Sequence, residues 1–222
     1  MRYVALATDY DGTLASHGAV APETLEALRR LAATGRKLIL VTGRRIDDLV
    51  QVFPEAAIFD RVVGENGPLV YRPKTRETRV LSEPPPAAFV EELRRRGVQP
   101  LAVGQVFVAT EQPNERVVLD VIGQLGLDLQ VILNKGSVMV LPVSVDKATG
   151  LRAVLEELGI SPQEVVGIGD AENDESFLAM CGLGVAVANA LDSLRARADQ
   201  VTRGENGDGV REIIESLINT TA

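Results

Sequence analysis

Two carboxylates stand one residue apart near the start of the chain. A mostly apolar run over residues 1–8 ends in the sequence Asp-Tyr-Asp-Gly-Thr-Leu, which begins at Asp9. In α/β proteins the carboxyl end of a parallel strand is where ligands are held, so Asp9 and Asp11 are well placed for chemistry. An Asp-Gly pair by itself is usually a turn that leaves a strand. The second Asp and the Thr after the Gly favour a site over a simple turn.

Three further polar clusters follow predicted strands or open a predicted helix. They are Thr42-Gly43-Arg44, Lys147, and Asp170 with Asp174. Each has a structural interpretation when taken alone: a turn, a solvated helix residue and capping charges at a helix N-terminus. Together they are hard to explain as structure. Four carboxylates that meet in one crevice repel, and they raise one another's pKa unless a cation lies among them.

Magnesium is the simplest cation for such a set of oxygen ligands. Mg²⁺ prefers octahedral oxygen coordination, takes few carboxylates, and keeps waters and substrate phosphate in its other positions. A hydroxyl, backbone amides beside small residues and a Lys ammonium are what a phosphoryl group needs in addition. The clusters supply these groups in Thr42, Gly43 and Lys147. The residues therefore predict a magnesium site that handles a phosphoryl group.

The spacing of apolar residues predicts the elements that position these clusters. Strands are expected over residues 1–8, 37–41, 58–63, 165–168 and 184–188, and helices over 22–34, 46–53, 146–158 and about 210–217. Such alternation of strand and helix is typical of a parallel sheet with right-handed crossovers. We therefore predict an α/β fold with a doubly wound parallel sheet, and its strand ends bring the polar clusters to one edge.

An inserted unit interrupts this alternation. From about residue 69, short β runs over 68–71 and 78–81 follow each other without a crossover helix. Two amphipathic helices and a hairpin around Asn134-Lys135-Gly136 come next. About seventy residues of this kind can form a small α/β domain of their own. We place the inserted unit at residues 71–141 and the core at 1–70 plus 142–222.

Composition excludes several classes of function. The 222 residues are 45% hydrophobic, and 31 acidic against 23 basic residues give a net charge of −8. No window is basic enough to follow a nucleic-acid backbone, and no apolar run reaches the roughly 18 to 20 residues that span a bilayer. We expect a cytoplasmic protein with neither nucleic acid nor membrane as partner. The one cysteine, Cys181, is expected to be a buried apolar residue, and the one histidine, His17, to lie in a loop outside the chemistry.

The polar clusters and their order resemble the four motifs of the haloacid dehalogenase (HAD) superfamily of phosphatases. The motifs are Asp-x-Asp-Gly-Thr-Leu, Thr-Gly-Arg, the Lys in Val-Asp-Lys-Ala-Thr-Gly-Leu, and Gly-Asp-x-x-Asn-Asp. The insertion lies between the second and third motifs, which resembles the Cof-like class IIB group with its α/β cap. Glu65-Asn66-Gly67 is similar to that group too, whereas Tyr10 stands where the group often has an apolar residue. The length and compact cap resemble small archaeal-type phosphoglycolate phosphatases.

The resemblance implies catalytic roles for the carboxylates. Asp9 would be the nucleophile that forms a phosphoaspartyl intermediate, and Asp11 the general acid and base. Mg²⁺ would be held by the carboxylate of Asp9, the backbone carbonyl of Asp11 and the carboxylate of Asp170. Asp174 would orient waters or Lys147 from outside the metal's ligand set. The implied activity is Mg²⁺-dependent hydrolysis of a phosphomonoester.

The resemblance also implies a phosphate-binding set. Thr42, Lys147 and the amides near Gly43 would bind the oxygens of the transferring group. Asn173 would help to fix Lys147. Arg44 would contact phosphate or pair with the cap. Positive charge from metal and lysine is the main catalytic contribution expected for phosphoryl transfer.

Several alternatives stay open at this level. Phosphoglycolate is the first expected substrate and a sugar phosphate the second, with cap residues near Lys135 or Glu111–Asn114 as candidate readers of the leaving group. The same chemistry would serve a phosphomutase, which passes the phosphoryl group to a second hydroxyl. A phospho-acceptor signalling domain also combines clustered Asp residues with a Thr and a Lys, although a cap would obstruct its partner-binding face. A homodimer is possible because such caps often pack against another subunit.

Overall fold

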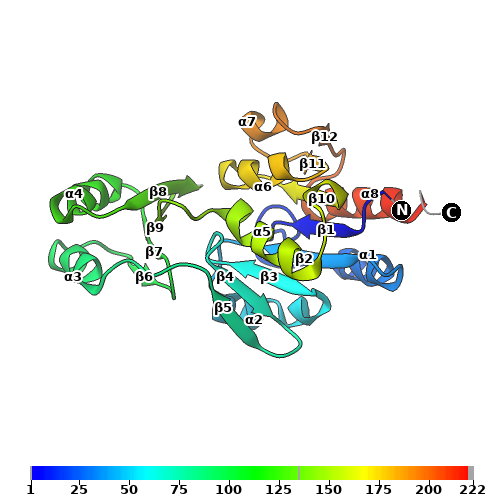
Figure 1. Cartoon of the computed structure of the whole chain (residues 1–222). Coiled ribbons are helices and arrows are strands. Elements are labelled where there is room, and N and C mark those ends of the chain that lie inside the picture. The colour runs from blue at the N-terminus through cyan, green and yellow to red at the C-terminus, as the bar shows by residue number, and fades with distance from the viewer. Residues whose placement is uncertain (1, 135, 220–222) are drawn as a thin grey trace.

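The computed structural model describes residues 2–134 and 136–219, and its strands form a larger and a smaller sheet (Figure 1). The strands of the larger sheet are β1 (Ala5–Thr8), β2 (Lys37–Val41), β3 (Arg61–Gly64), β4 (Leu69–Arg72), β5 (Glu77–Val80), β10 (Val165–Gly169), β11 (Leu183–Ala186) and β12 (Gln200–Val201). Their spatial order is β12-β11-β10-β1-β2-β3-β4-β5. The strands from β12 to β3 are parallel, and β4 and β5 extend the sheet in antiparallel fashion.

Helices cover both faces of this sheet. They are α1 (Pro22–Ala33), α2 (Ile46–Val52), α5 (Lys147–Leu158), α6 (Glu175–Met180), α7 (Asp192–Arg195) and α8 (Asn206–Asn219), with single 3₁₀ turns η1 (Pro54–Ile58), η2 (Pro162–Glu164) and η3 (Glu172–Asp174). Helix α1 packs on α8, and α5 packs on α6. Right-handed crossovers from β1 to β2 and from β10 to β11 leave in opposite directions, which puts these two pairs on opposite faces. The doubly wound α/β fold predicted from the sequence is confirmed.

The central strands are almost entirely apolar because helices bury both of their faces. All four residues of β1 and all five of β10 are buried. The register places Thr8 opposite both Leu40 of β2 and Ile168 of β10, so these strands end at the same level. The residues that follow each strand are therefore brought to one edge of the sheet.

Several strand boundaries differ from those expected, three of them by more than one residue at one end. The first strand begins at Ala5 rather than at residue 1, which lies outside the described residues. The third strand covers Arg61–Gly64 rather than 58–63, because Pro54 starts the 3₁₀ turn η1 and that turn takes up Ile58. The last expected strand covers Leu183–Ala186 rather than 184–188.

The inserted unit starts later than the predicted residue 71. Strand β4 pairs with β3, and β5 pairs with β4, so both belong to the larger sheet. Short antiparallel strands extend an existing sheet edge when their backbone groups find partners there, and the sequence pattern alone does not show which edge that is. We use the name cap for residues 82–143, which follow β5 and precede α5.

The cap folds around its own apolar core. Its elements are α3 (Ala87–Arg95), β6 (Ala102–Val103), β7 (Val108–Glu111), α4 (Glu115–Leu125), β8 (Leu129–Asn134) and β9 (Ser137–Pro142), with sheet order β6-β7-β9-β8. Phe89, Leu93, Val118 and Val140 are buried between its helices and its sheet. Figure 1 shows the cap beside the core, away from both chain termini. Among the described residues, no helix is both long enough and apolar enough to cross a bilayer.

Candidate active site

The strand ends of the larger sheet bring together the side chains predicted from the sequence. Asp9 follows β1, Thr42 follows β2, and Asp170 follows β10. Asp9, Thr42 and Asp170 are all buried. The fourth predicted group, Lys147, opens α5, whose N-cap Asp146 accepts a hydrogen bond from the Thr149 amide at 2.8 Å. The predicted convergence of these four residues on one sheet edge agrees with the geometry.

Lys147 is the most unusual of these side chains, because it is an ammonium with only 2% of its surface exposed. Its Nζ donates to Asp9 Oδ1 at 2.6 Å and to Asp174 Oδ1 at 2.5 Å. Burial would lower the pKa of Lys147, but the charges of Asp174 and Asp9 outweigh it and raise that pKa above its ordinary value. The lysine is therefore a fixed positive charge inside the site.

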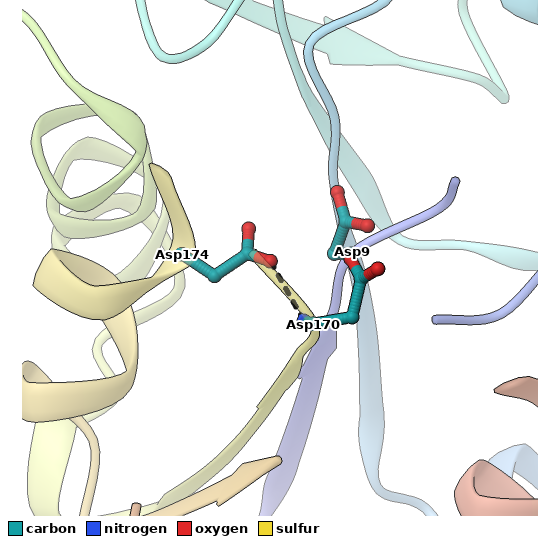
Figure 2. Close-up of side chains that lie close together, drawn as sticks. All are labelled: Asp9, Asp170 and Asp174. Atoms are coloured by element: carbon teal, nitrogen blue, oxygen red, sulfur yellow. Dashed lines mark hydrogen bonds between the residues drawn. The ribbon is translucent and has the colours of Figure 1, made fainter. Parts of the chain in front are cut away.

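Three carboxylates surround the position where a cation would lie. Asp9, Asp170 and Asp174 offer oxygens within 4.8 Å of one another, and Figure 2 shows the three side chains close together, with Asp174 bonded to the backbone nitrogen of Asp170. Burial raises the pKa of Asp9 to about 8, opposed by Lys147 and reinforced by the charges of Asp174 and Asp170. Such a set of oxygen donors fits Mg²⁺.

Asp174 differs from the other two carboxylates in how its oxygens are used. Its Oδ2 accepts from the amides of Asp170 and Ala171 at 2.9 and 3.0 Å, and its Oδ1 accepts from Lys147. A carboxylate that accepts three hydrogen bonds orients its neighbours more readily than it coordinates a metal. Asp9 and Asp170 are thus the carboxylates best suited to hold Mg²⁺, and Asp174 holds the loop and the lysine in place.

The carboxylate of Asp11 does not belong to this group of three and is turned toward Arg44 instead. Its side chain is 46% exposed and forms a two-pronged ion pair with Arg44, with contacts of 2.6 and 2.7 Å. The strand ends at Thr8, and the chain then turns so that the Ala15 amide bonds the carbonyl of Tyr10. The alternation of a strand therefore no longer places Asp11 on the same side as Asp9.

Arg44 is itself held by an aromatic ring. Its guanidinium carbon lies 5.3 Å from the centroid of the Tyr10 ring. Tyr10 is fully buried, donates its hydroxyl to the Gly18 carbonyl at 2.9 Å and packs on Phe53. A guanidinium stacked on a ring and paired with a carboxylate is well oriented. Tyr10 thus faces away from the carboxylate cluster and supports the Arg44–Asp11 pair.

Two further residues predicted to serve the phosphate site, Thr42 and Asn173, form hydrogen bonds to other groups of the core. The hydroxyl of Thr42 accepts from the Arg44 amide at 3.1 Å. Asn173 donates to Asn66 Oδ1 at 3.0 Å, whereas the ammonium of Lys147 is held by carboxylates. The expected Asn173–Lys147 contact is therefore replaced by a contact to the turn after β3. The Oδ1 of Asn173 is buried without a described partner, so it is a polar atom available to a ligand.

A cavity of about 270 Å³ opens above the cluster, between the sheet edge and the cap. The core side includes the predicted residues Asp9, Asp11, Gly43, Arg44, Lys147, Asp170 and Asn173. The cap side includes Ala102, Phe107, Ala109, Asn134, Ser137 and Met139. A cleft between two units with a few converging polar groups is the usual form of a small-molecule site.

The sequence indicated part of the cap wall of this cavity: Asn134 and Ser137 lie near the expected Lys135 and line the cavity, whereas Ala102, Phe107 and Ala109 were not identified. Of the expected candidates, Lys135 lies outside the described residues. Asn114 donates instead to the carbonyl of Gln99 and the hydroxyl of Thr110, within the cap. The signal available in the sequence was the hairpin, since residues on both sides of its loop line the cavity. His17 is exposed, as expected of a loop residue outside the chemistry.

Known proteins resemble this chain over nearly its whole length. The model of the haloacid dehalogenase-like hydrolase family matches residues 6–124 and 131–214. A phosphoglycolate phosphatase from Haloarcula marismortui is 31% identical over 218 residues, which are 94% of this chain and 95% of the relative. One from Methanopyrus kandleri is 32% identical over 222 residues, with 95% of each chain covered.

Solved structures share the fold at lower identity. A haloacid dehalogenase-like hydrolase from Bacteroides thetaiotaomicron superposes with a TM-score of 0.83 at 22% identity, covering 97% of this chain and 99% of that chain. A HAD subclass IIB sugar phosphatase superposes with a TM-score of 0.77 at 22% identity, covering 96% and 98%. These likenesses extend through the cap as well as the core. The chain belongs to the haloacid dehalogenase-like hydrolase family, as its four motifs predicted.

Proposed function

We propose that this protein is a Mg²⁺-dependent phosphatase that hydrolyses a small phosphomonoester through a phosphoaspartyl intermediate. The observation that carries the proposal is the buried ammonium of Lys147, held between Asp9 and Asp174 beside the carboxylate of Asp170. Phosphoryl transfer needs fixed positive charge around the transferring oxygens and a positioned nucleophile. Lys147 supplies the charge, and it orients the nucleophile through the same hydrogen bond.

Asp9 is the proposed nucleophile. Its bond to Lys147 fixes the orientation of the carboxylate. A carboxylate oxygen attacks phosphorus, the bond from phosphorus to the leaving-group oxygen breaks, and an acyl phosphate forms on Asp9. Attack by water on phosphorus then releases inorganic phosphate and restores the carboxylate.

The carboxylates of Asp9 and Asp170 and the backbone carbonyl of Asp11 are the proposed holders of Mg²⁺. When bound there, the ion supplies positive charge that stabilises the negative charge developing on the phosphoryl oxygens. Asp174 keeps the loop after β10 and the ammonium of Lys147 in place. Thr42, the amide of Gly43 and Asn173 are the proposed additional ligands of the phosphoryl oxygens.

Asp11 is the proposed general acid and base. It would protonate the leaving alkoxide and later take a proton from the attacking water. In the structure its carboxylate is bound to Arg44, so it must leave this ion pair to reach the substrate. An anionic substrate that binds Arg44 would favour that release by replacing the carboxylate as its partner.

Phosphoglycolate is the proposed substrate, with a sugar phosphate as the alternative. The relatives named phosphoglycolate phosphatases support the first choice. The cavity of about 270 Å³ suits a small ester. Arg45 also lines it, and its guanidinium lies 3.9 Å from each of the carboxylates of Asp47 and Asp48, a separation too long for tight pairing. This arginine is the proposed partner for a carboxylate on the leaving group.

A panel of phosphomonoesters assayed with Mg²⁺ tests the proposal. We expect phosphate release that EDTA abolishes and added Mg²⁺ restores, and we expect Asp9→Asn to abolish it. The matched control is Asp208→Asn, an exposed carboxylate on α8, which should keep full activity. Activity retained by Asp9→Asn would exclude the mechanism. A phosphoryl group that stays on the protein for minutes without turnover would favour a phospho-acceptor domain, and formation of an isomeric ester would favour a phosphomutase.

A further inference from the structure

Glu65 is a buried carboxylate that the proposed chemistry does not use. It follows β3 in the core, and only 1% of its surface is exposed. Its Oε1 accepts from the amide of Gln105 at 2.8 Å, and its Oε2 accepts from the amides of Val106 and Phe107 at 2.8 and 3.2 Å. These three amides belong to the cap loop between β6 and β7. One core carboxylate therefore binds three consecutive backbone amides of the cap.

The cap loop approaches this carboxylate as closely as a glycine allows. A Cβ atom on Gly104 would lie 2.5 Å from Oε1 of Glu65 and 2.6 Å from its Cδ. The Gly104 amide also bonds the carbonyl of Phe107 at 2.9 Å, which closes the loop so that its amides face one point. Concave arrangements of consecutive amides of this kind bind anions. The loop is shaped around the Glu65 carboxylate.

The turn that carries Glu65 has an unfavourable backbone conformation. Glu65 and Asn66 have φ of +55° and +62°, a region that residues other than glycine seldom occupy. Their amides bond the carbonyls of Arg44 and Thr42 at 3.0 and 3.1 Å, which ties the turn to the loop after β2. Backbone strain of this kind persists where the surroundings hold it, often at functional positions.

The next residue in the turn makes a second connection between core and cap. The Nδ2 of Asn66 lies 2.9 Å from the sulfur of Met139 in β9, and its Oδ1 accepts from Asn173. Met139 and Asn173 both line the cavity, as does Phe107 from the loop that Glu65 binds. The turn after β3 therefore touches both walls of the cavity at once.

We propose that Glu65 is a positioning residue that fixes the cap over the cavity and thereby sets which phosphomonoesters bind well. The expected change in KM rests on the proposed phosphatase function. The expected loosening of the cap loop does not. Glutamine at this position keeps the shape and loses the charge, and it presents only one acceptor oxygen to three amide donors. Releasing the loop lets Phe107 and its neighbours move away from the substrate, while Asp9 and Lys147 stay in place.

The test compares the full-length protein with Glu65→Gln and with Gly104→Ala. The second variant leaves Glu65 intact and displaces the loop by the contact of its Cβ, so it keeps the test open if the first does not fold. The matched control is Glu212→Gln. Glu212 also accepts hydrogen bonds from backbone amides, those of Arg203 and Gly204, but it lies on α8 in the core.

Two measurements are made on each variant. Hydrogen exchange followed by mass spectrometry should show faster exchange at residues 105–107 in both cap variants, with exchange in β1 and β10 unchanged. In steady-state assays with the best ester of the panel, KM should rise about tenfold while kcat stays within about twofold, since the catalytic groups are untouched. Glu212→Gln should change neither.

Wild-type exchange at 105–107 in both cap variants would overturn the proposal, as would wild-type KM. Absence of phosphatase activity in every protein would refute the proposed function, while the exchange result would still decide the role of Glu65.

Discussion

A lysine ammonium with almost no exposure normally loses its charge on burial, because desolvation disfavours the charged form. Lys147 keeps its charge because the carboxylates of Asp9 and Asp174 lie at hydrogen-bond distance on either side. The same ammonium opposes the rise in the pKa of Asp9 that burial and the charges of Asp174 and Asp170 cause. The ammonium and the carboxylates are thus interdependent, and removal of the central charge should affect both stability and chemistry.

The variant Lys147→Met tests this interdependence. It leaves two buried carboxylates without their partner, so we expect a loss of about 3 to 5 kcal/mol in the free energy of unfolding. We also expect kcat to fall about 10²- to 10³-fold in Mg²⁺, the range for losing one preorganised donor to a transition state. Urea unfolding and steady-state assays measure the two effects. The control Lys37→Met removes a half-exposed ammonium 3.2 Å from Asp60 and should change stability by about 1 kcal/mol or less. Near-wild-type stability of Lys147→Met would contradict the account.

Cys181 gives a prediction that depends on pH. Burial raises the pKa of its thiol to about 12, so below pH 10 the thiol stays protonated and unreactive in the folded protein. Ellman's reagent at pH 8 should label the native protein slowly and the urea-unfolded protein fast. Because the folded state holds this proton more tightly, the thiol's contribution to stability is present at neutral pH and is lost as pH rises above the ordinary thiol pKa of about 8.5. Rapid stoichiometric labelling of the native protein would show that the thiol is accessible.

Several site residues were predictable because each follows a strand or opens a helix. Asp9, Thr42 and Asp170 stand directly after apolar runs, and parallel strands end at one edge. The Arg44–Asp11 pair was not predictable, because it depends on the turn that the chain makes after Thr8. Glu65 stood in a motif noticed in the sequence, but its partners lie about forty residues further on, in a loop without sequence pattern.

At the scale of elements, two helical glycines show how packing decides the effect of one substitution. Gly150 lies in α5, where a Cβ would come within 2.3 Å of a Val63 methyl and 2.4 Å of the Gly67 carbonyl. Gly123 lies in α4 with nothing within 4 Å of that position. Alanine favours a helix over glycine by about 1 kcal/mol when space permits.

We therefore expect opposite results from the two alanine variants. Gly123→Ala should stabilise the protein by up to about 1 kcal/mol. Gly150→Ala should destabilise it by about 1 to 3 kcal/mol, because α5 must move away from β3 and take Lys147 with it. Thermal unfolding measures both, and activity should fall only for Gly150→Ala. Equal shifts of the two melting temperatures would show that the packing of α5 on β3 is looser than the structure indicates.

Periodicity predicted the long elements well and the inserted boundary poorly. Helix α4 ends at Leu125 and is followed by Gly126, whose φ is +60°, and α5 ends at Leu158 and is followed by Gly159, whose φ is +66°. Both helix ends therefore follow from the conformational freedom of glycine. Strands β4 and β5 were assigned to the insertion because they lack a crossover helix. Their actual place is the edge of the larger sheet, and the choice of that edge depends on tertiary pairing with β3.

At the scale of the whole molecule, the chain is a core that holds the chemistry and a cap that closes the cavity. The cap has its own buried residues, and the core sheet is complete without it. One cap residue, Val106, is buried in the core's apolar cluster beside the amides that Glu65 binds. Among the described residues, the contacts near Glu65, Asn66 and Val106 seat the cap on the core together with the packing of β8 on η3 and the hydrogen bond from Gln130 to the Val145 carbonyl. Because the catalytic residues lie in the core and the cap forms the other wall of the cavity, we expect that the core can fold without the cap.

Replacing residues 82–143 with a short Gly-Ser linker should give a folded core. It keeps β4, β5 and Leu81, which packs against the core, and it keeps Asp9, Lys147 and Asp170. Mg²⁺ should still stabilise this core against heat, because ligands that bind only the folded state raise the melting temperature. Discrimination among phosphomonoesters should be lost, since the cap wall of the cavity is gone.

A matched deletion of residues 71–141 should fail to fold, because it removes β5 and splits β4. If that deletion folded and the shorter one did not, the boundary after Leu81 would be wrong. Unchanged substrate preference in the shorter deletion would show that the cap does not select the substrate.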